Sequence, residues 1–226
     1  MIDKIVSEIV SNAPEIYPKI IDRVFQTQSG GYGFGDKFVG TRIPILRKIA
    51  ANYKDLSLED SELLLQNPLH EARFTALVIL IKHFKKHPEE VFQIYKDNTK
   101  YVNNWDLVDI SSHWIFGNYC LLKQSNDSIW ELAESDNLWE NRIAIVSSWT
   151  FIKKDYFQLT FDLCEHFMQH EHHLIHKACG WMLREVSKRD PLQVVEFVND
   201  HKMPSIMRSY ALERIRYRPK YLPAFA

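Results

Sequence analysis

One pattern recurs six times along this chain: a charged residue stands at the start of a short apolar run with helical spacing. The marking residues are Arg42, Arg73, Asp106, Arg142, Lys177 and Arg208, so that successive steps span 31, 33, 36, 35 and 31 residues. Two helices of about 12 residues and two short turns fill such a step. The spacing therefore predicts an all-α fold, an α-solenoid of about six HEAT-like helical pairs that form a curved superhelix with a concave face.

Glycine and proline are placed as a helical chain requires. Only 7 of the 226 residues are glycine, which is too few for the special turns of a β-sandwich or a dinucleotide-binding fold. Proline either breaks a helix or is tolerated in the first helical turn, so four pairs each predict a helix end or the first turn of the next helix: Asn67-Pro68, His87-Pro88, Asp190-Pro191 and Met203-Pro204. The length and the continuous repeat predict a single domain over residues 1–226.

The segment 27–40 interrupts the helical pattern, because it holds five of the seven glycines. It lacks the Gly-Lys-Ser/Thr ending of a P-loop, and no strand precedes it, so it is not a phosphate cradle. We predict a glycine-rich loop whose aromatic residues Tyr32, Phe34 and Phe38 either pack on the first repeat or touch a ligand.

The charge of the chain is unevenly distributed. With 28 basic and 29 acidic residues the net charge is −1, which taken alone counts against a nucleic-acid-binding protein. Residues 177–220 nevertheless contain ten Lys or Arg against five Asp or Glu, a local charge of +5 that leaves −6 for the rest of the chain. Such polarity is compatible with a local phosphate-binding surface.

Several features bear on the compartment of the protein. No stretch approaches the roughly 20 apolar residues that cross a bilayer, and the first residues lack the order of a signal peptide. Cys120, Cys164 and Cys179 are far apart and odd in number, as expected of buried thiols in a reducing compartment. We therefore expect a cytoplasmic protein without membrane association, and the polar end repeats suggest a monomer.

The run Asn103-Asn104-Trp105-Asp106-Leu107-Val108-Asp109 is the strongest candidate for chemistry. Either asparagine can cap a helix that begins at Trp105, and Trp105 and Asp109 then share one face. Asp106 is explained as an anion in the first turn, where the helix dipole favours negative charge. Asp109 is not explained in this way, because it lies between apolar Val108 and Ile110.

A second group of residues can join this run. Trp181 follows Gly180, a glycine inside a predicted helix that costs about 1 kcal/mol relative to alanine and indicates either close packing or close approach of a ligand. A groove with Trp105, Trp181 and Asp109, flanked by Arg142 and Arg184, suits a cationic base on a sugar. Indoles attract the cation, the carboxylate stabilises positive charge on the sugar, and the arginines hold phosphates. The alternative is ordinary packing of these side chains in the core.

Three segments resemble the bacterial DNA alkylation repair family, the HEAT-like-repeat 3-methyladenine/7-methylguanine DNA glycosylases of the AlkD type. They are Trp105-Asp106-Leu107-Val108-Asp109, Ser135-Asp136-Asn137-Leu138-Trp139-Glu140-Asn141-Arg142 and Lys177-Ala178-Cys179-Gly180-Trp181-Met182-Leu183-Arg184-Glu185. The start Gly40-Thr41-Arg42-Ile43-Pro44 is also similar to the family. The likeness extends from about residue 2 to 215, in the same order, but the loop 27–40 is longer than expected.

The resemblance implies a function and its residues. It implies a monofunctional glycosylase that removes cationic N3- or N7-alkylated purines from double-stranded DNA, leaves an abasic site and needs no metal or other cofactor. Asp109 corresponds to the catalytic aspartate, Trp105 and Trp181 to the tryptophans at the sugar-phosphate of the lesion, and Arg142 to an arginine that binds the backbone nearby. The expected contacts to other DNA phosphates are Arg42, Arg47, Arg73, Lys177, Arg184 and Arg208.

Other functions remain open on the sequence alone. A noncatalytic module could use the same groove for damaged or branched DNA, and many helical solenoids bind proteins. Added salt distinguishes the DNA-binding module from the protein-binding solenoid. The affinity for DNA falls steeply as the salt concentration rises, whereas the affinity of an apolar groove for a peptide changes little. His166, His170, His172, His173 and His176 include i, i+4 pairs, but neither a His-Glu-x-x-His motif nor a nearby cysteine favours metal binding, so we expect an exposed, partly protonated turn.

Overall fold

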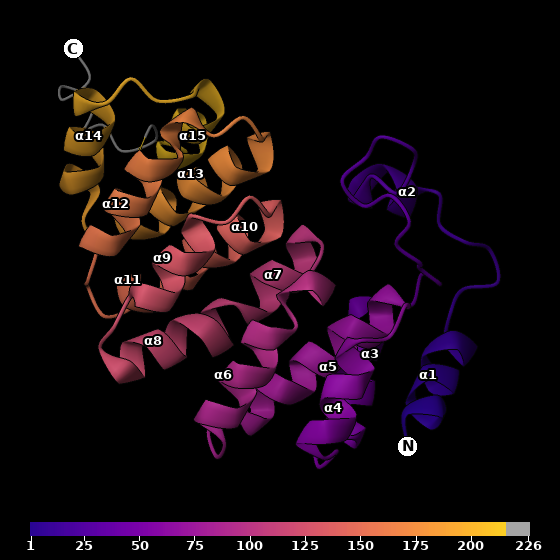
Figure 1. Cartoon of the computed structure of the whole chain (residues 1–226). Helices are drawn as coiled ribbons and strands as arrows, with labels where there is room; N and C mark the ends of the chain where they lie inside the picture. The colour runs from indigo at the N-terminus through magenta and orange to yellow at the C-terminus, as the bar shows by residue number, and fades with distance from the viewer. Residues whose placement is uncertain (216–226) are drawn as a thin grey trace. The chain divides into compact units, whose positions relative to one another are not determined.

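The computed structural model describes residues 1–215, and over these residues the regular structure is helical, with one isolated bridge between Lys37 and Leu69. The chain divides into two compact units, residues 1–111 and a second unit that begins at Ser112 (Figure 1). The all-α expectation is therefore confirmed. The expectation of one domain over residues 1–226 stays a prediction. No helix among the described residues has both the length and the apolar character of a membrane span.

The first unit consists of seven α-helices and one short 3-10 helix over its described length. They are α1 (Ile2–Ser11), α2 (Ile20–Phe25), α3 (Ile43–Asn52), α4 (Leu58–Leu65), α5 (His70–His83), α6 (Pro88–Asp97), the 3-10 helix Thr99–Tyr101 and α7 (Trp105–Ser111). Helix α5 lies at the centre, because α3, α4, α6 and α7 all pack on it. Its residues from His70 to Leu80 are all buried, so the whole circumference of this part of the helix is covered.

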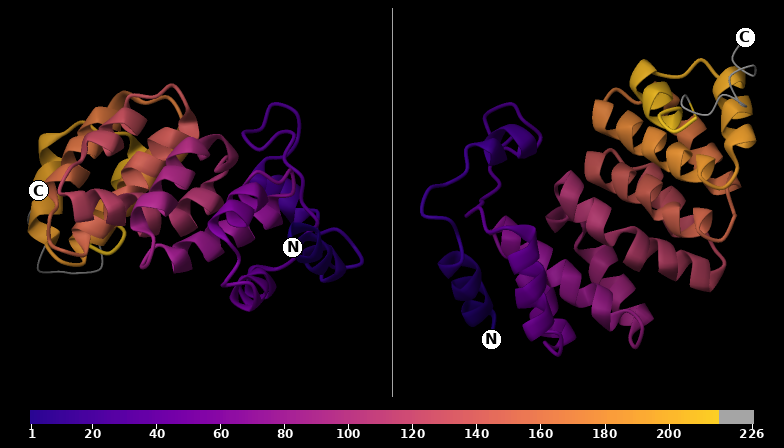
Figure 2. Two further views of the ribbon diagram at one scale, coloured as in Figure 1. Left: turned by 60° about the horizontal axis from the view of Figure 1, so that its bottom comes forward. Right: turned by 180° about the vertical axis from the view of Figure 1, so that it is seen from behind.

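The second unit repeats this design over its described residues. It contains the π-helical turn His113–Gly117, α8 (Asn118–Lys123), α9 (Asp127–Ala133), α10 (Leu138–Ser147), α11 (Trp149–Ile152), α12 (Gln158–His166), the 3-10 helix Phe167–Gln169, α13 (His173–Ser187), α14 (Pro191–Asp200) and α15 (Ser205–Ala211). Helix α13 contacts α10, α12, α14 and α15, and its inner face is apolar and buried. Figure 2 shows the stacked helices of each unit from two further directions.

The predicted repeat is confirmed within each unit. Every marking residue lies at or near a helix start: Arg42 is the N-cap of α3, and Arg73, Asp106, Arg142, Lys177 and Arg208 fall in the first five residues of α5, α7, α10, α13 and α15. Consecutive marked helices are packed neighbours, α3 on α5 and α5 on α7 in the first unit, α10 on α13 and α13 on α15 in the second. Within the two units, the sequence steps of 31, 33, 35 and 31 residues therefore correspond to the stacking of consecutive marked helices.

Side-chain caps and prolines mark several helix starts. The Ser57 hydroxyl accepts a hydrogen bond from the backbone N–H of Asp60 at 3.1 Å and caps α4. Pro88 and Pro191 occupy the first helical positions of α6 and α14. Asp190 adds a side-chain cap to α14, because its carboxylate accepts from the backbone N–H of Leu192 at 3.1 Å. These local bonds satisfy donors that the first turn of a helix leaves free.

Gly180 serves close helix packing. It lies in α13 where α15 crosses, and a Cβ at this position would stand 2.6 Å from the carbonyl oxygen of Met207 and 2.6 Å from Cβ of Tyr210. Separations this short are not tolerated between non-bonded atoms, so the two helices approach each other because residue 180 has no side chain. Of the two explanations that the sequence left open for this glycine, the structure supports packing.

Replacement of Gly180 by alanine is expected to destabilise the second unit by roughly 1–3 kcal/mol, because the added methyl group forces α13 away from α15. Helix propensity alone predicts the opposite, a gain of about 1 kcal/mol. The free energy of unfolding in urea distinguishes the two effects. Equal or higher stability of the variant would show that the contact with α15 gives way at little cost.

Candidate functional site

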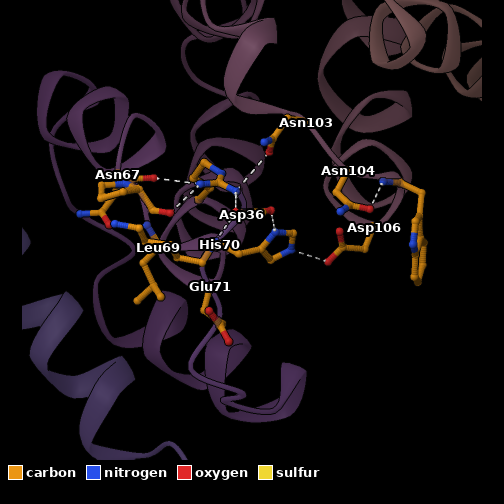
Figure 3. Close-up of polar contacts among 12 residues, drawn as sticks. Asp36, Asn67, Leu69, His70, Glu71, Asn103, Asn104 and Asp106 are labelled. Atoms are coloured by element: carbon orange, nitrogen blue, oxygen red, sulfur yellow. Dashed lines mark hydrogen bonds and ion pairs between the residues drawn. The ribbon is translucent and has the colours of Figure 1, made fainter. Parts of the chain in front are cut away.

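Asp36 anchors the glycine-rich loop to the start of α5. Its Oδ2 atom lies 2.8 Å from Nδ1 of His70, and its Oδ1 atom accepts a hydrogen bond of 2.5 Å from the Arg73 guanidinium (Figure 3). The side chains of all three residues are 2–5% exposed. A carboxylate this deep is stabilised by two cations, so the loop is held by a buried ionic contact rather than by surface charge.

His70 extends this contact to the next marked helix. Its second ring nitrogen, Nε2, lies 2.9 Å from Oδ2 of Asp106 in the first turn of α7, so the imidazole joins two carboxylates (Figure 3). Burial by itself lowers the pKa of His70, but the carboxylates of Asp106 and Asp36 outweigh burial and raise it to about 9. The same pairing holds the pKa of Asp36 below its ordinary value, although burial acts in the opposite direction. At neutral pH the bridge is therefore a charged imidazolium between two carboxylates.

Glu71, also at the start of α5, binds the backbone at the end of the glycine-rich loop. Its carboxylate accepts hydrogen bonds from the backbone N–H groups of Gly40, at 2.7 Å, and Val39, at 3.1 Å. Gly40 has a φ of +87°, a conformation that favours glycine, and it directs the chain into α3. With the bridge between Lys37 and Leu69, these bonds fix residues 36–40 along the start of α5.

The aromatic rings of this region form one stack. Phe38 lies 4.2 Å from His70 and 4.7 Å from Phe25, and Phe25 lies nearly parallel to Trp105 at 5.4 Å between ring centres. Phe38 therefore packs on the first unit, one of the two roles predicted for the loop aromatics, whereas Phe34 is 68% exposed. Through this stack and the His70 bridge, the loop supports the first turn of α7 at two points.

A cavity of about 390 Å³ lies beside the stack. Its walls are mostly apolar and come from the segment before α2, from α2, from α3 and from the loop. Its polar edge consists of Thr41, Arg42, His70, Glu71 and Asp106. The volume falls within the range of about 300–1,000 Å³ that small-molecule sites occupy.

The structure separates the three candidate residues of α7 by their surroundings. The helix begins at Trp105, as predicted, and Asn104 Oδ1 accepts from the Trp105 backbone N–H at 2.9 Å. Asp106 is 9% exposed and turned to His70. Trp105 and Asp109 are half-buried and lie one helical turn apart, so they share a face of the first unit. The interpretation of Asp106 as an anion in the first helical turn accounts for its position. It did not predict that Asp106 pairs with the His70 imidazolium.

The other two candidates lie in the second unit. Arg142 is 5% exposed, and its Nη1 donates to the carbonyl oxygen of Leu174 at 2.7 Å, in the first turn of α13. Trp181 is half-buried on α13, donates to Glu185 Oε1 at 3.2 Å and lies 5.4 Å from the ring of Trp149. The structure thus brings Trp105 together with Asp109 in one unit, and places Arg142 and Trp181 on neighbouring helices of the other.

The predicted phosphate-binding cations differ in how free they are. Arg42 and Arg47 are exposed, and Lys177 is half-buried. Arg73 is engaged by Asp36 and is 4% exposed, so its guanidinium supports the loop instead of facing solvent. Arg184 pairs with Glu213, and Arg208 donates to the carbonyl oxygen of Val198 at 2.9 Å. Arg216, Arg218 and Lys220, which contribute to the predicted basic segment, lie outside the described residues.

The histidine cluster differs from the expected protonated turn. Burial, followed by neighbouring positive groups, lowers the pKa of His172 and His173, and burial is also the main reason that the pKa of His170 and His176 is lowered. These rings are therefore largely neutral at pH 7. His172 has a structural role, because its Nδ1 accepts from the backbone N–H of Leu174 at 3.2 Å and caps α13.

The sequence did not predict the ionic bridge of Asp36, His70 and Asp106. A signal was present, because His70, Glu71 and Arg73 are ionisable residues next to the long apolar run that begins at Phe74. Polar residues beside such a run are buried with it unless the helix ends there, and buried charges require partners. Their partners lie one repeat away, where single-chain spacing does not identify them.

The bridge predicts a pH-dependent stability. Because the folded pKa of His70, about 9, is above its unfolded value of 6.5, its contribution is fully present below pH 6.5 and is lost as the pH rises through about 9. The free energy of unfolding should fall by roughly 3 kcal/mol over this interval. We expect urea titrations between pH 6 and 10 to show this fall in the wild type and not in His70→Gln. Parallel profiles for the two proteins would contradict a charged His70.

Comparison with solved structures finds the same helical fold in several bacterial proteins. A structure described as a predicted DNA alkylation repair enzyme from Enterococcus faecalis is similar with a TM-score of 0.70 at 18% identity, covering 82% of this chain and 92% of that one. AlkD2 from Streptococcus mutans is similar with a TM-score of 0.57 at 18% identity, covering 87% and 96%. The protein smu.31 from Streptococcus mutans UA159 gives a TM-score of 0.52 at 20% identity, covering 75% and 98%.

The sequence itself matches the family described as DNA alkylation repair enzyme over residues 19–215. The chain therefore belongs to that family. A comparison with curated proteins found no match. Family membership supports a role in the repair of alkylated DNA.

Proposed function

We propose that this protein is a DNA glycosylase that removes cationic N3- or N7-alkylated purines from duplex DNA and leaves an abasic site. The observation that supports the proposal is that the two carboxylates of α7 have different surroundings. Asp106 is turned inward to His70, whereas Trp105 and Asp109, one turn apart, are half-buried on one face. An indole and a carboxylate side by side suit a positively charged substrate, and family membership provides the biological setting.

Cleavage of the N-glycosidic bond of an alkylated purine requires little from the protein beyond one negative charge near the sugar. An alkylated purine already carries a positive charge, so it leaves as a neutral base when the bond from N9 to C1′ of the sugar breaks. Positive charge then develops on the sugar. In this mechanism the Asp109 carboxylate stabilises that charge and orients the water that attacks C1′. Trp105, on the same helix face as Asp109, packs against the sugar of the lesion. Trp181, in the second unit, is retained as a separate candidate contact with the sugar-phosphate of bound DNA.

The DNA contacts that we propose outside the lesion are the predicted cations whose side chains are accessible to solvent. Arg42, Arg47 and Lys177 are the predicted cations that the described structure leaves accessible for phosphates. The backbone contact proposed for Arg142 requires its guanidinium to serve the phosphate as well as the Leu174 carbonyl. Arg73 is not part of the proposed set, because its charge is already engaged by Asp36.

The test is a base-release assay with duplex DNA that contains 7-methylguanine, in buffer with a chelator. We expect free 7-methylguanine and an abasic site, and DNA affinity that falls steeply as salt is added. Salt-sensitive binding without release of base would favour a noncatalytic DNA-binding module. Absence of DNA binding at low salt would favour a protein-interaction scaffold.

A further inference from the structure

The glycine-rich loop exposes one large apolar side chain to solvent. Phe34 is 68% exposed, whereas Tyr32 and Phe38 on either side of it are half-buried. The Tyr32 hydroxyl donates a hydrogen bond of 2.9 Å to the Val24 carbonyl oxygen, and the Phe38 ring lies 4.2 Å from the ring of His70. Phe34 is therefore the aromatic residue of the loop that the first unit leaves accessible to a partner.

The backbone on both sides of Phe34 is fixed by contacts that do not involve its ring. Before it, the backbone N–H of Gly33 donates a hydrogen bond of 3.2 Å to the Gln26 carbonyl oxygen. After it, the Asp36 carboxylate is held in the buried ionic contact with His70. These contacts order the loop in advance, so a partner that covers the ring does not have to order the backbone as well.

Gly33 places this part of the loop against the first turn of α7. A Cβ at residue 33 would stand 2.1 Å from the Phe25 carbonyl oxygen and 3.0 Å from Nδ2 of Asn104, so the loop backbone packs closely on both residues. Asn104 bonds the backbone N–H of Trp105, and the Phe25 ring stacks on the Trp105 indole. Phe34 thus directly follows a residue that packs on the two supports of Trp105.

The same loop carries a positive charge at the surface. Lys37 is exposed, and its backbone is fixed, because its carbonyl oxygen accepts a hydrogen bond of 2.8 Å from the backbone N–H of His70. Arg42, two residues after the loop, is exposed as well. An apolar ring and cations in one short segment suit the backbone of DNA, in which sugars with apolar faces alternate with charged phosphates.

We propose that the glycine-rich loop is a second DNA-binding element, in which Phe34 packs against sugars of the strand beside the nucleotide that Trp105 contacts. Lys37 pairs with a neighbouring phosphate. This inference rests on the proposed contact of Trp105 with DNA. Both loop contacts are made to the DNA backbone, so they hold the duplex without a pocket for a base. The buried contact of Asp36 then serves DNA binding as well as stability, because it keeps the loop beside α7.

Fluorescence anisotropy with a labelled duplex tests the loop contact without any release of base. The duplex contains one tetrahydrofuran, an abasic analogue, and the titrations run between about 50 and 200 mM salt. The loop variants are Phe34→Ala, Phe34→Trp and Lys37→Gln. Leu63→Ala is the control for loss of an exposed apolar side chain, and Lys86→Gln removes a charge beyond the opposite end of α5. A thermal unfolding curve of each variant verifies its fold.

We expect Phe34→Ala to weaken DNA binding by about fivefold and to keep the salt dependence of the wild type, because the lost contact is apolar. Phe34→Trp keeps an aromatic ring and should bind at least as tightly as the wild type. Lys37→Gln should reduce the slope of log affinity against log salt by about one. Leu63→Ala and Lys86→Gln should stay within about twofold of the wild type.

Unchanged affinity of Phe34→Ala, or an equal loss in Leu63→Ala, would overturn the proposal. A protein that depends on Phe34 for DNA binding and yet releases no 7-methylguanine would contradict the glycosylase function alone. A wild type that does not bind the duplex at low salt would overturn both the loop contact and the proposed function.

Discussion

Replacement of Asp109 by asparagine is expected to reduce the rate of 7-methylguanine release by about 100- to 1,000-fold. Asparagine has nearly the same size and keeps a hydrogen-bonding oxygen, but it has no charge with which to stabilise a positive sugar. DNA affinity should remain within about threefold of the wild type, because an anion contributes nothing attractive to phosphate binding. The measurement is single-turnover release of base, with protein in excess over DNA.

The matched control for this variant is Asp106→Asn on the same helix. Asp106 bonds His70 and is 9% exposed, so its replacement should lower stability, and it should slow base release far less than Asp109→Asn because the Asp109 charge stays in place. The two variants thus separate a catalytic carboxylate from a structural one three residues away. If Asp109→Asn releases base at the wild-type rate, Asp109 is not the catalytic residue, and the glycosylase must use another carboxylate.

The second large effect is expected for Asp36→Asn, which should lower the free energy of unfolding of the first unit by roughly 3–5 kcal/mol. The substitution removes the negative charge that pairs with both the His70 imidazole and the Arg73 guanidinium. Both cations are buried, so water cannot solvate their charges in its place. The loss should shrink at high pH, where His70 in the wild type also gives up its proton.

Urea unfolding at pH 7 measures this effect, and Asp55→Asn is its surface control. The side chain of Asp55 is 89% exposed beside Lys54, so its replacement should change stability by less than about 0.5 kcal/mol. An equally small effect of Asp36→Asn would show that the loop is held by its backbone bonds and aromatic stack. The contribution of the ionic bridge would then be minor.

The bridge also has a consequence for the site on α7. Loop 27–40 reaches α7 through His70 and through the stack of Phe25 on Trp105. Loss of Asp36 is therefore expected to disturb Trp105 as well as stability. This makes the glycine-rich segment a support for the proposed lesion contact, a role that its composition alone did not predict.

The helices and their order followed from the sequence because their causes are local. Apolar residues three and four apart, capping by Ser57 and proline at the start of α6 and α14 all act within a few residues. The period of 31 to 36 residues was visible for the same reason, since each helical pair repeats the same local signals. The family resemblance, carried by contiguous motifs, likewise needed no tertiary information.

The partners of the buried charges were decided by tertiary structure. Asp36 meets His70 at a separation of 34 residues, and His70 meets Asp106 at a separation of 36. Both values are close to one repeat, so the period indicated how far away a partner would lie. It did not indicate which residue would be the partner, because that depends on how one helix is rotated and shifted against the next. Arg73 shows the difference, since its sequence position suggested a phosphate contact and its rotation on α5 brought it to Asp36.

The sequence by itself determined the all-helical repeat, the glycine-rich loop and the pairing of Trp105 with Asp109 on one helix face. Tertiary structure alone decided that Gly180 serves contact with α15, that a charged His70 joins the loop to α7, and that Phe34 stays exposed while Gly33 packs on Asn104. The physical reason is the range of the forces involved. Backbone hydrogen bonds and helical periodicity act between neighbours in the chain, whereas desolvation and charge pairing depend on which surfaces the packed helices bring together.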